Sequence, residues 1–87
     1  MKIGFIGMTH LGLCQLAACA EKRFQVYGFD LDKEKIISLK NLKTYYDEPN
    51  LKRMLKKNYE RIKFSSNFED IKKLELVFIS LDIKTKK

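Results

Sequence analysis

A chain of 87 residues has room for one small domain, and its 45% hydrophobic and 11% aromatic content excludes an intrinsically disordered polypeptide. The net charge of +7 comes mostly from lysines spread along the sequence, so we expect a solvated basic surface and disfavour nucleic-acid binding by the densest cluster, residues 52–63. Gly4 and Gly7 interrupt the first apolar run, which predicts neither a signal peptide nor a membrane-spanning segment there.

The first 30 residues are predicted to form a strand, a turn, a helix and a second strand. Residues 2–7 and 24–30 have the nearly continuous apolar character of central parallel strands. The residues between them are enough for a crossover between parallel strands, with a mostly apolar and buried helix from His10 to Glu21. This pattern predicts the opening βαβ unit of a dinucleotide-binding sheet.

Two glycines flank the turn between the first strand and the helix. Gly7 would allow a tight turn, Gly12 would let the helix pack close to the sheet, and the N–H groups at the helix start would face a pyrophosphate. Asp30 lies 18 residues after Gly12. The motif places an acidic side chain that accepts hydrogen bonds from the adenosine ribose at roughly this distance, about 20 residues. A carboxylate there favours NAD, because it would repel a 2′-phosphate.

Thr9 stands where the motif G-x-G-x-x-G has its middle glycine. Thr9 either caps the helix and offers its hydroxyl to the phosphate, or its bulk pushes the phosphate away. The sequence leaves both outcomes open. His10 follows in the first turn, beside the proposed phosphate, where an imidazolium would contribute, although a half-exposed histidine without such a role is the favoured interpretation.

The rest of the chain is predicted to alternate helices with strands. Asp32 caps an amphipathic helix that runs to about residue 43, and Lys35 lies one turn into it. After a loop at residues 44–47, Glu48 and Pro49 open a third helix. The amphipathic pattern of the second helix comes from Ile36, Ile37 and Leu39, and the buried stripe expected on the third helix is Leu51, Met54 and Leu55.

Two further strands complete the predicted sheet. Residues 61–65 alternate like a short edge strand, and Ser66 to Glu69 has the spacing of a capping box that starts a brief helix. Residues 76–81 are expected to form a fully buried strand. Right-handed crossovers then predict an α/β fold, a parallel four-stranded sheet of order 3-2-1-4 with helices on both faces. Its ligand crevice lies between Gly7 and Leu81.

The two cysteines, Cys14 and Cys19, share the first helix but lie on different faces of it. A disulfide between them is therefore disfavoured, and both are interpreted as small core-filling residues. We expect a reducing, cytoplasmic setting.

The chain resembles the N-terminal, NAD-binding domain of the UDP-glucose/GDP-mannose dehydrogenase family. The likeness extends over essentially all 87 residues, and the E-P-x-L turn at Glu48 to Leu51 is more selective than the glycine motif. The matching segments are KIGFIG, GFDLDKEKI, YYDEPNL, RIKFSSNFED and LVFIS.

The resemblance implies a Rossmann-like half domain that binds NAD, formed by residues 1–87 as a single, partial domain. The expected cofactor-binding residues are Gly7, Met8, Thr9, His10, Leu11, Gly12, Asp30 and Lys35. Two departures from the family pattern stand out: Asn50 replaces a glycine, and residues 81–84 lack the V-x-T-P run whose threonine contacts the cofactor.

Family enzymes oxidise the C6 hydroxyl of a nucleotide sugar with a cysteine nucleophile from a downstream domain, and neither Cys14 nor Cys19 matches that nucleophile. We therefore assign no catalytic residue and no metal ligand, and we expect NAD binding without turnover by this chain alone. The alternative is a remnant or interaction module that keeps the fold but not the cofactor. In either case the open edge of the last strand is expected to pair with a second copy or a partner chain.

Overall fold

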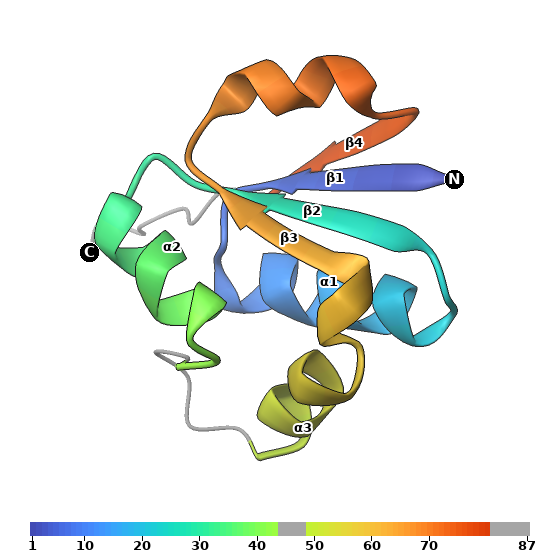
Figure 1. The fold of residues 1–87 in the computed structure, drawn as a ribbon, viewed down its shortest axis with the longest axis vertical. Coiled ribbons are helices and arrows are strands. Elements are labelled where there is room, and N and C mark those ends of the chain that lie inside the picture. The colour runs from blue at the N-terminus through green and yellow to red at the C-terminus, as the bar shows by residue number, and fades with distance from the viewer. Residues whose placement is uncertain (44–48, 81–87) are drawn as a thin grey trace, which may run out of the picture.

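A four-stranded parallel sheet forms the centre of the computed structural model, which describes residues 1–43 and 49–80 (Figure 1). The strand order is β3-β2-β1-β4, as predicted. The strands are β1 (Lys2–Ile6), β2 (Gln25–Phe29), β3 (Ile62–Ser65) and β4 (Leu76–Ile79). The predicted loop at residues 44–47, Glu48 and the departure at residues 81–84 lie outside the described residues.

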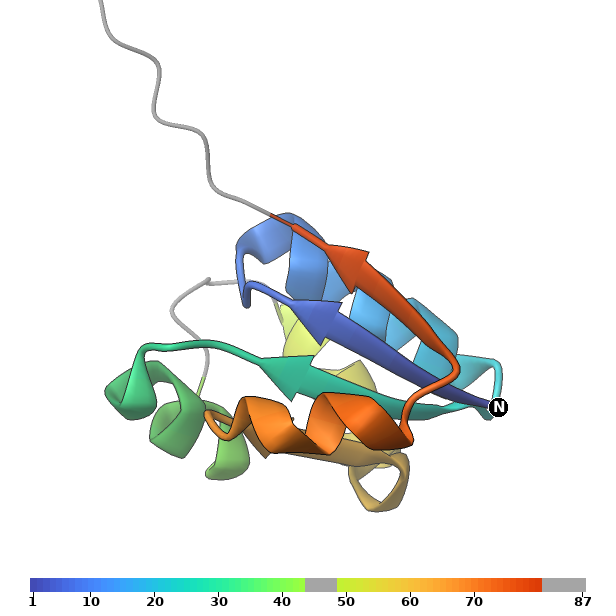
Figure 2. The same ribbon diagram turned by 90° about the horizontal axis from the view of Figure 1, so that it is seen from above.

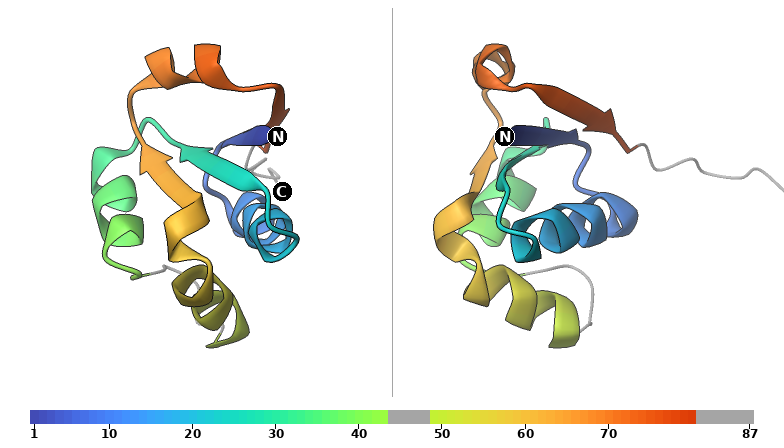
Figure 3. Two further views of the ribbon diagram at one scale, coloured as in Figure 1. Left: turned by 45° about the vertical axis from the view of Figure 1, so that its right-hand side comes forward. Right: turned by 90° about the vertical axis from the view of Figure 1, so that its right-hand side faces the viewer.

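Helices cover both faces of the sheet. The helices are α1 (His10–Glu21), α2 (Lys33–Lys40) and α3 (Pro49–Lys57), with two 3-10 helices, η1 (Tyr59–Arg61) and η2 (Phe68–Lys73). In Figures 1 and 3, η2 lies on one side of the sheet, and α1 and α3 lie on the other. The connection from β3 to β4 thus covers the face that the first crossover leaves open.

The main apolar core lies between the sheet and the three α-helices. Alternate residues of neighbouring strands face it in register, with Phe5 opposite Gly28 and Phe78. A Cβ at Gly28 would lie 2.6 Å from Met8 Sδ and 2.9 Å from Phe64 Cδ1, so a larger residue there would require these side chains to shift. Residues buried in this core include Ile3, Phe5, Leu13, Leu16, Val26, Ile36, Leu39, Leu51, Leu55, Ile62 and Phe64.

The opposite face of the sheet packs against η2. Phe29 of β2 is fully buried, and its ring lies 5.6 Å from that of Phe68. Asn67 caps η2 by accepting a hydrogen bond from Glu69 N, so the cap lies one residue after the Ser66 expected from the capping-box spacing.

Two of the helices end at non-glycine residues in the left-handed conformation. Arg23 (φ 72°) follows α1 and Leu42 (φ 60°) follows α2. In each case the next residue donates back across the helix end: Phe24 N to Cys19 O at 3.2 Å, and Lys43 N to Ser38 O at 2.8 Å. These are Schellman motifs. The second one ends α2 at Lys40, so the predicted extension to residue 43 is wrong.

The prediction of a fully buried last strand is also wrong. β4 is an edge strand, and Figure 2 shows it beside β1 at the open side of the sheet. Leu76, Phe78 and Ile79 are 43%, 44% and 67% exposed. Its apolar sequence is that of a strand covered on both faces, whereas the described residues cover it only in part.

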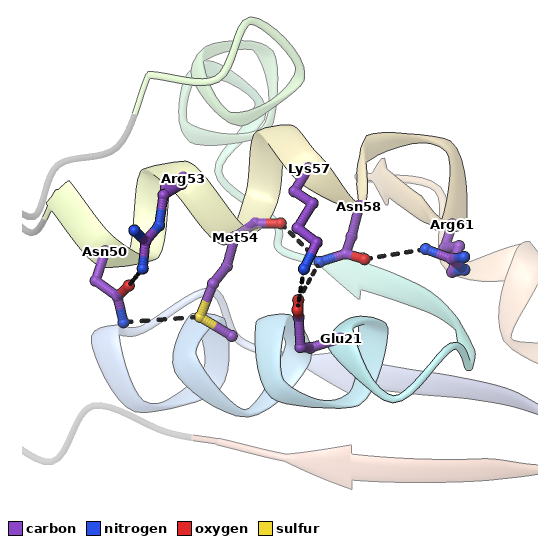
Figure 4. Close-up of polar contacts among 7 residues, drawn as sticks. All are labelled: Glu21, Asn50, Arg53, Met54, Lys57, Asn58 and Arg61. Carbon is purple, nitrogen blue, oxygen red and sulfur yellow. Dashed lines mark hydrogen bonds and ion pairs between the residues drawn. The ribbon is translucent and has the colours of Figure 1, made fainter.

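A polar cluster joins the end of α1 to the end of α3 (Figure 4). Glu21 accepts hydrogen bonds from Lys57 Nζ at 2.6 Å and from Asn58 Nδ2 at 2.9 Å. Asn58 is buried and also accepts from Arg61 Nη1 at 3.0 Å. The hydrogen bond from Lys57 is the main cause that lowers the pKa of Glu21, and the bond from Asn58 adds to it.

No helix in the described part of the chain is long and apolar enough to cross a membrane. Cys14 and Cys19 are half-buried against the core and form no disulfide with each other. Burial raises the pKa of the Cys19 thiol.

Candidate cofactor-binding site

The turn after β1 is built on a glycine that no other residue replaces without strain. Gly7 has a φ of +95°, and a Cβ there would lie 1.9 Å from Ser80 O. Its N–H donates to Phe29 O at 2.8 Å, which ties the turn to the end of β2. The chain therefore turns tightly between the ends of its two neighbouring strands.

Thr9 is the N-cap of α1. Its Oγ1 accepts a hydrogen bond from Gly12 N at 3.0 Å, and its φ of −72° is one that any residue adopts. The capping role proposed for Thr9 is thus present, and the backbone does not require a glycine there. Gly12 is required for packing, because a Cβ on it would lie 2.3 Å from Gly7 O.

Asp30 lies at the carboxyl end of β2, beside this turn. Its Oδ2 accepts from Met8 N at 2.9 Å and its Oδ1 accepts from Asp32 N at 3.0 Å. Lys35 Nζ lies 3.8 Å from Asp30 Oδ2. Since a carboxylate has about four acceptor positions, both oxygens keep capacity for the hydroxyls of a ribose.

The other predicted residues lie in the same turn, with different side-chain environments. Met8 is fully buried in the core, so only its backbone reaches the turn. Leu11 is 62% exposed and His10 is exposed, although the helix had been expected to be buried over much of its circumference. Because the first N–H groups of a helix have no partner within it, the positive end of the α1 dipole faces any anion held at this turn.

Ser80 joins this group, and the sequence interpretation missed it. It follows β4, its N–H donates to Ile6 O at 2.8 Å, and it is 8% exposed. Its Oγ lies 2.7 Å from Thr9 Oγ1. The available signal was its position: a polar residue that ends an apolar strand beside the switch point of a parallel sheet.

Comparison with known proteins identifies the family. The model of the NAD binding domain of the UDP-glucose/GDP-mannose dehydrogenase family matches residues 1–87. Protein CapL of Staphylococcus aureus is 32% identical over 79 residues, which are 91% of this chain and 18% of CapL. An uncharacterised protein of Methanocaldococcus jannaschii is 31% identical over 80 residues, which are 91% of this chain and 9% of that protein.

Solved structures share the fold. A GDP-mannose dehydrogenase from Pseudomonas aeruginosa, in a ternary complex, has a TM-score of 0.90 at 22% identity, over 100% of this chain and 21% of that one. A UDP-D-ManNAc dehydrogenase from Pyrococcus horikoshii has a TM-score of 0.88 at 25% identity, over 93% of this chain and 20% of that one. The chain thus spans about a fifth or less of these relatives.

The Rossmann-like sheet and its order are therefore confirmed, and the cofactor of the matched domain is NAD. Because the family model extends from the first residue to the last, the chain belongs to the UDP-glucose/GDP-mannose dehydrogenase family and carries sequence of its NAD-binding domain.

Proposed function

We propose that residues 1–87 form a single, partial domain that holds the adenosine and pyrophosphate portions of NAD. The pyrophosphate lies against the turn and the start of α1, and the adenosine ribose lies at the end of β2. The residues that we assign to this site are Gly7, Met8, Thr9, His10, Leu11, Gly12, Asp30 and Lys35.

The placement of Asp30 is the observation that carries this proposal. Its carboxylate is held by Met8 N and Asp32 N, so it lies between the phosphate turn and the start of α2. Its remaining acceptor positions suit the two ribose hydroxyls. The negative charge of Asp30 would repel a 2′-phosphate, so we propose a preference for NAD over NADP. Lys35 Nζ lies 3.8 Å from Asp30 Oδ2, and its positive charge reduces this preference.

We propose that this chain alone does not catalyse hydride transfer. Catalysis needs the nicotinamide and a substrate held in fixed orientation, and orientation supplies much of the rate. The chain spans 18% of CapL and 21% of the Pseudomonas aeruginosa enzyme. Oxidation of a nucleotide sugar is therefore proposed only for an assembly in which further polypeptide completes the site.

Titration of the chain with NAD, followed by NMR, tests the proposal. We expect weak, saturable binding that Asp30→Ala lowers about tenfold, as the loss of a hydrogen bond to a charged group predicts. Glu34→Ala is the matched control, because it removes an exposed carboxylate that lies in the first turn of α2, outside the proposed site. Absence of binding at millimolar NAD, or equal binding by the Asp30 variant, would contradict the assignment.

The open edge of β4 supports a second proposal, association with a second copy or a partner chain. Leu76, Phe78 and Ile79 leave an uncharged, apolar edge that can extend the sheet. Ile79→Lys should prevent such pairing, because a charge on an edge strand opposes it. Sedimentation of a strictly monomeric wild-type chain at high concentration would count against the proposal.

We propose a cytoplasmic location. Two observations support it: Cys14 and Cys19 form no disulfide with each other, and the matched domain binds NAD.

A further inference from the structure

A pair of hydroxyl groups connects the end of β4 to the phosphate turn. Thr9 Oγ1 and Ser80 Oγ lie 2.7 Å apart, and either atom is able to donate. Thr9 Oγ1 also accepts from Gly12 N at 3.0 Å. Within residues 1–43 and 49–80, neither hydroxyl has another hydrogen-bond partner.

Counting hydrogens shows that this pair always keeps one to donate. The two hydroxyls carry two hydrogens, and their mutual bond uses one. If Thr9 donates to Ser80, the remaining hydrogen belongs to Ser80, which is 8% exposed. If Ser80 donates to Thr9, the remaining hydrogen belongs to Thr9, which is only half-buried in the turn. The second arrangement is favoured, because a buried donor without an acceptor is costly.

We propose that Ser80 is a positioning residue for the pyrophosphate of NAD. With Gly12 N and Ser80 both donating to Thr9 Oγ1, the two lone pairs of that oxygen are filled, and Thr9 donates its own hydrogen to a phosphate oxygen. The Thr9 hydroxyl thereby takes the place of the close backbone approach that a middle glycine permits. This role rests on the proposed NAD binding and deepens it, because it adds a residue from β4 to the site.

The chain of donors also explains why the effect of Ser80 should depend on Thr9. A hydroxyl that accepts two hydrogen bonds is a stronger donor, and a phosphate is a charged acceptor. Ser80 therefore acts on the ligand only through Thr9, so its contribution should disappear when the Thr9 hydroxyl is removed.

A double-mutant cycle in the 87-residue chain tests this dependence, with NAD, ADP and adenosine as probes in NMR titrations. We expect Thr9→Val, which keeps the shape and removes the hydroxyl, to weaken NAD and ADP about tenfold. Ser80→Ala should weaken them about threefold, and the double variant should match Thr9→Val. Adenosine, which has no phosphate, should bind all variants equally. Thr9→Ser should keep wild-type affinity.

The outcomes separate the two levels of the proposal. An equal effect of Ser80→Ala with and without the Thr9 hydroxyl, or equal losses for adenosine and ADP, would overturn the positioning role and leave NAD binding intact. Unchanged affinity in Thr9→Val would do the same. Failure of the wild-type chain to bind NAD would overturn both. Ser38→Ala, outside the site, and thermal unfolding of each variant distinguish a loss of contact from a loss of fold.

Discussion

Asn58 gives the sharpest test of how α3 stabilises this small domain through α1. Its side chain is 3% exposed; Nδ2 donates to Glu21 Oε2 and to Met54 O, both at 2.9 Å, and Oδ1 accepts from Arg61 at 3.0 Å. Each hydrogen bond contributes about 1 kcal/mol net, so Asn58→Ala should lower the free energy of unfolding by about 2–3 kcal/mol. That is a large share of the roughly 4–13 kcal/mol expected for a chain of this size.

Thermal unfolding followed by circular dichroism measures this loss. At about 4–8 °C per kcal/mol for a domain of this size, the Tm of Asn58→Ala should fall by about 10–20 °C. Asn50→Ala is the matched control: Asn50 lies in α3, which Asn58 directly follows, but it is exposed and accepts a hydrogen bond from Arg53 Nη2 at 2.5 Å, and its loss should cost less than about 0.5 kcal/mol. Equal Tm values for the two variants would refute the reasoning.

Three other substitutions have defined outcomes. The hydrogen bond from Lys57 lowers the pKa of Glu21, so the Glu21 carboxylate stabilises the fold above its ordinary pKa of 4.5. This stabilisation is lost as the pH falls through the lower pKa of the folded state. Glu21→Gln should therefore flatten the acid side of a plot of Tm against pH, and an unchanged acid side would contradict this. Arg23→Gly should raise the free energy of unfolding in urea by about 0.5–1 kcal/mol, since glycine tolerates a φ of 72°. A lower free energy of unfolding would show that the backbone of Arg23 is not strained. Gly7→Ala should cost about 3 kcal/mol by the same assay, because its Cβ would meet Ser80 O at 1.9 Å; a near-neutral result would mean that β4 yields easily.

Hydrophobic runs and glycine spacing predicted the strands, their order and the bounds of α1, because these features depend on local periodicity and on a strong topological rule. The end of α2 was missed, because its left-handed residue is Leu42 rather than a glycine. The exposure of Phe78 was missed, because an apolar strand at an edge has the same sequence as one in the centre.

The candidate site was likewise predicted in part, where its residues follow a sequence motif, and missed where they depend on tertiary structure. Gly7, Gly12 and Asp30 were found because their spacing follows a known motif, and the structure brings them together at the ends of β1 and β2. Ser80 was not found, because it lies about 70 residues from Thr9 and meets it only through the pairing of β4 with β1. Contacts of that kind depend on tertiary structure alone.

The position of β1 in the middle of the sheet affects how this chain folds as it is synthesised. β1 is made first, yet its two neighbours, β2 and β4, begin at Gln25 and Leu76. At about 5–20 residues per second, one side of β1 stays unpaired for several seconds after β2 has emerged. During that interval β1, rather than β4, is the apolar edge of the sheet, so the nascent chain is open to aggregation along β1 until β4 leaves the ribosome.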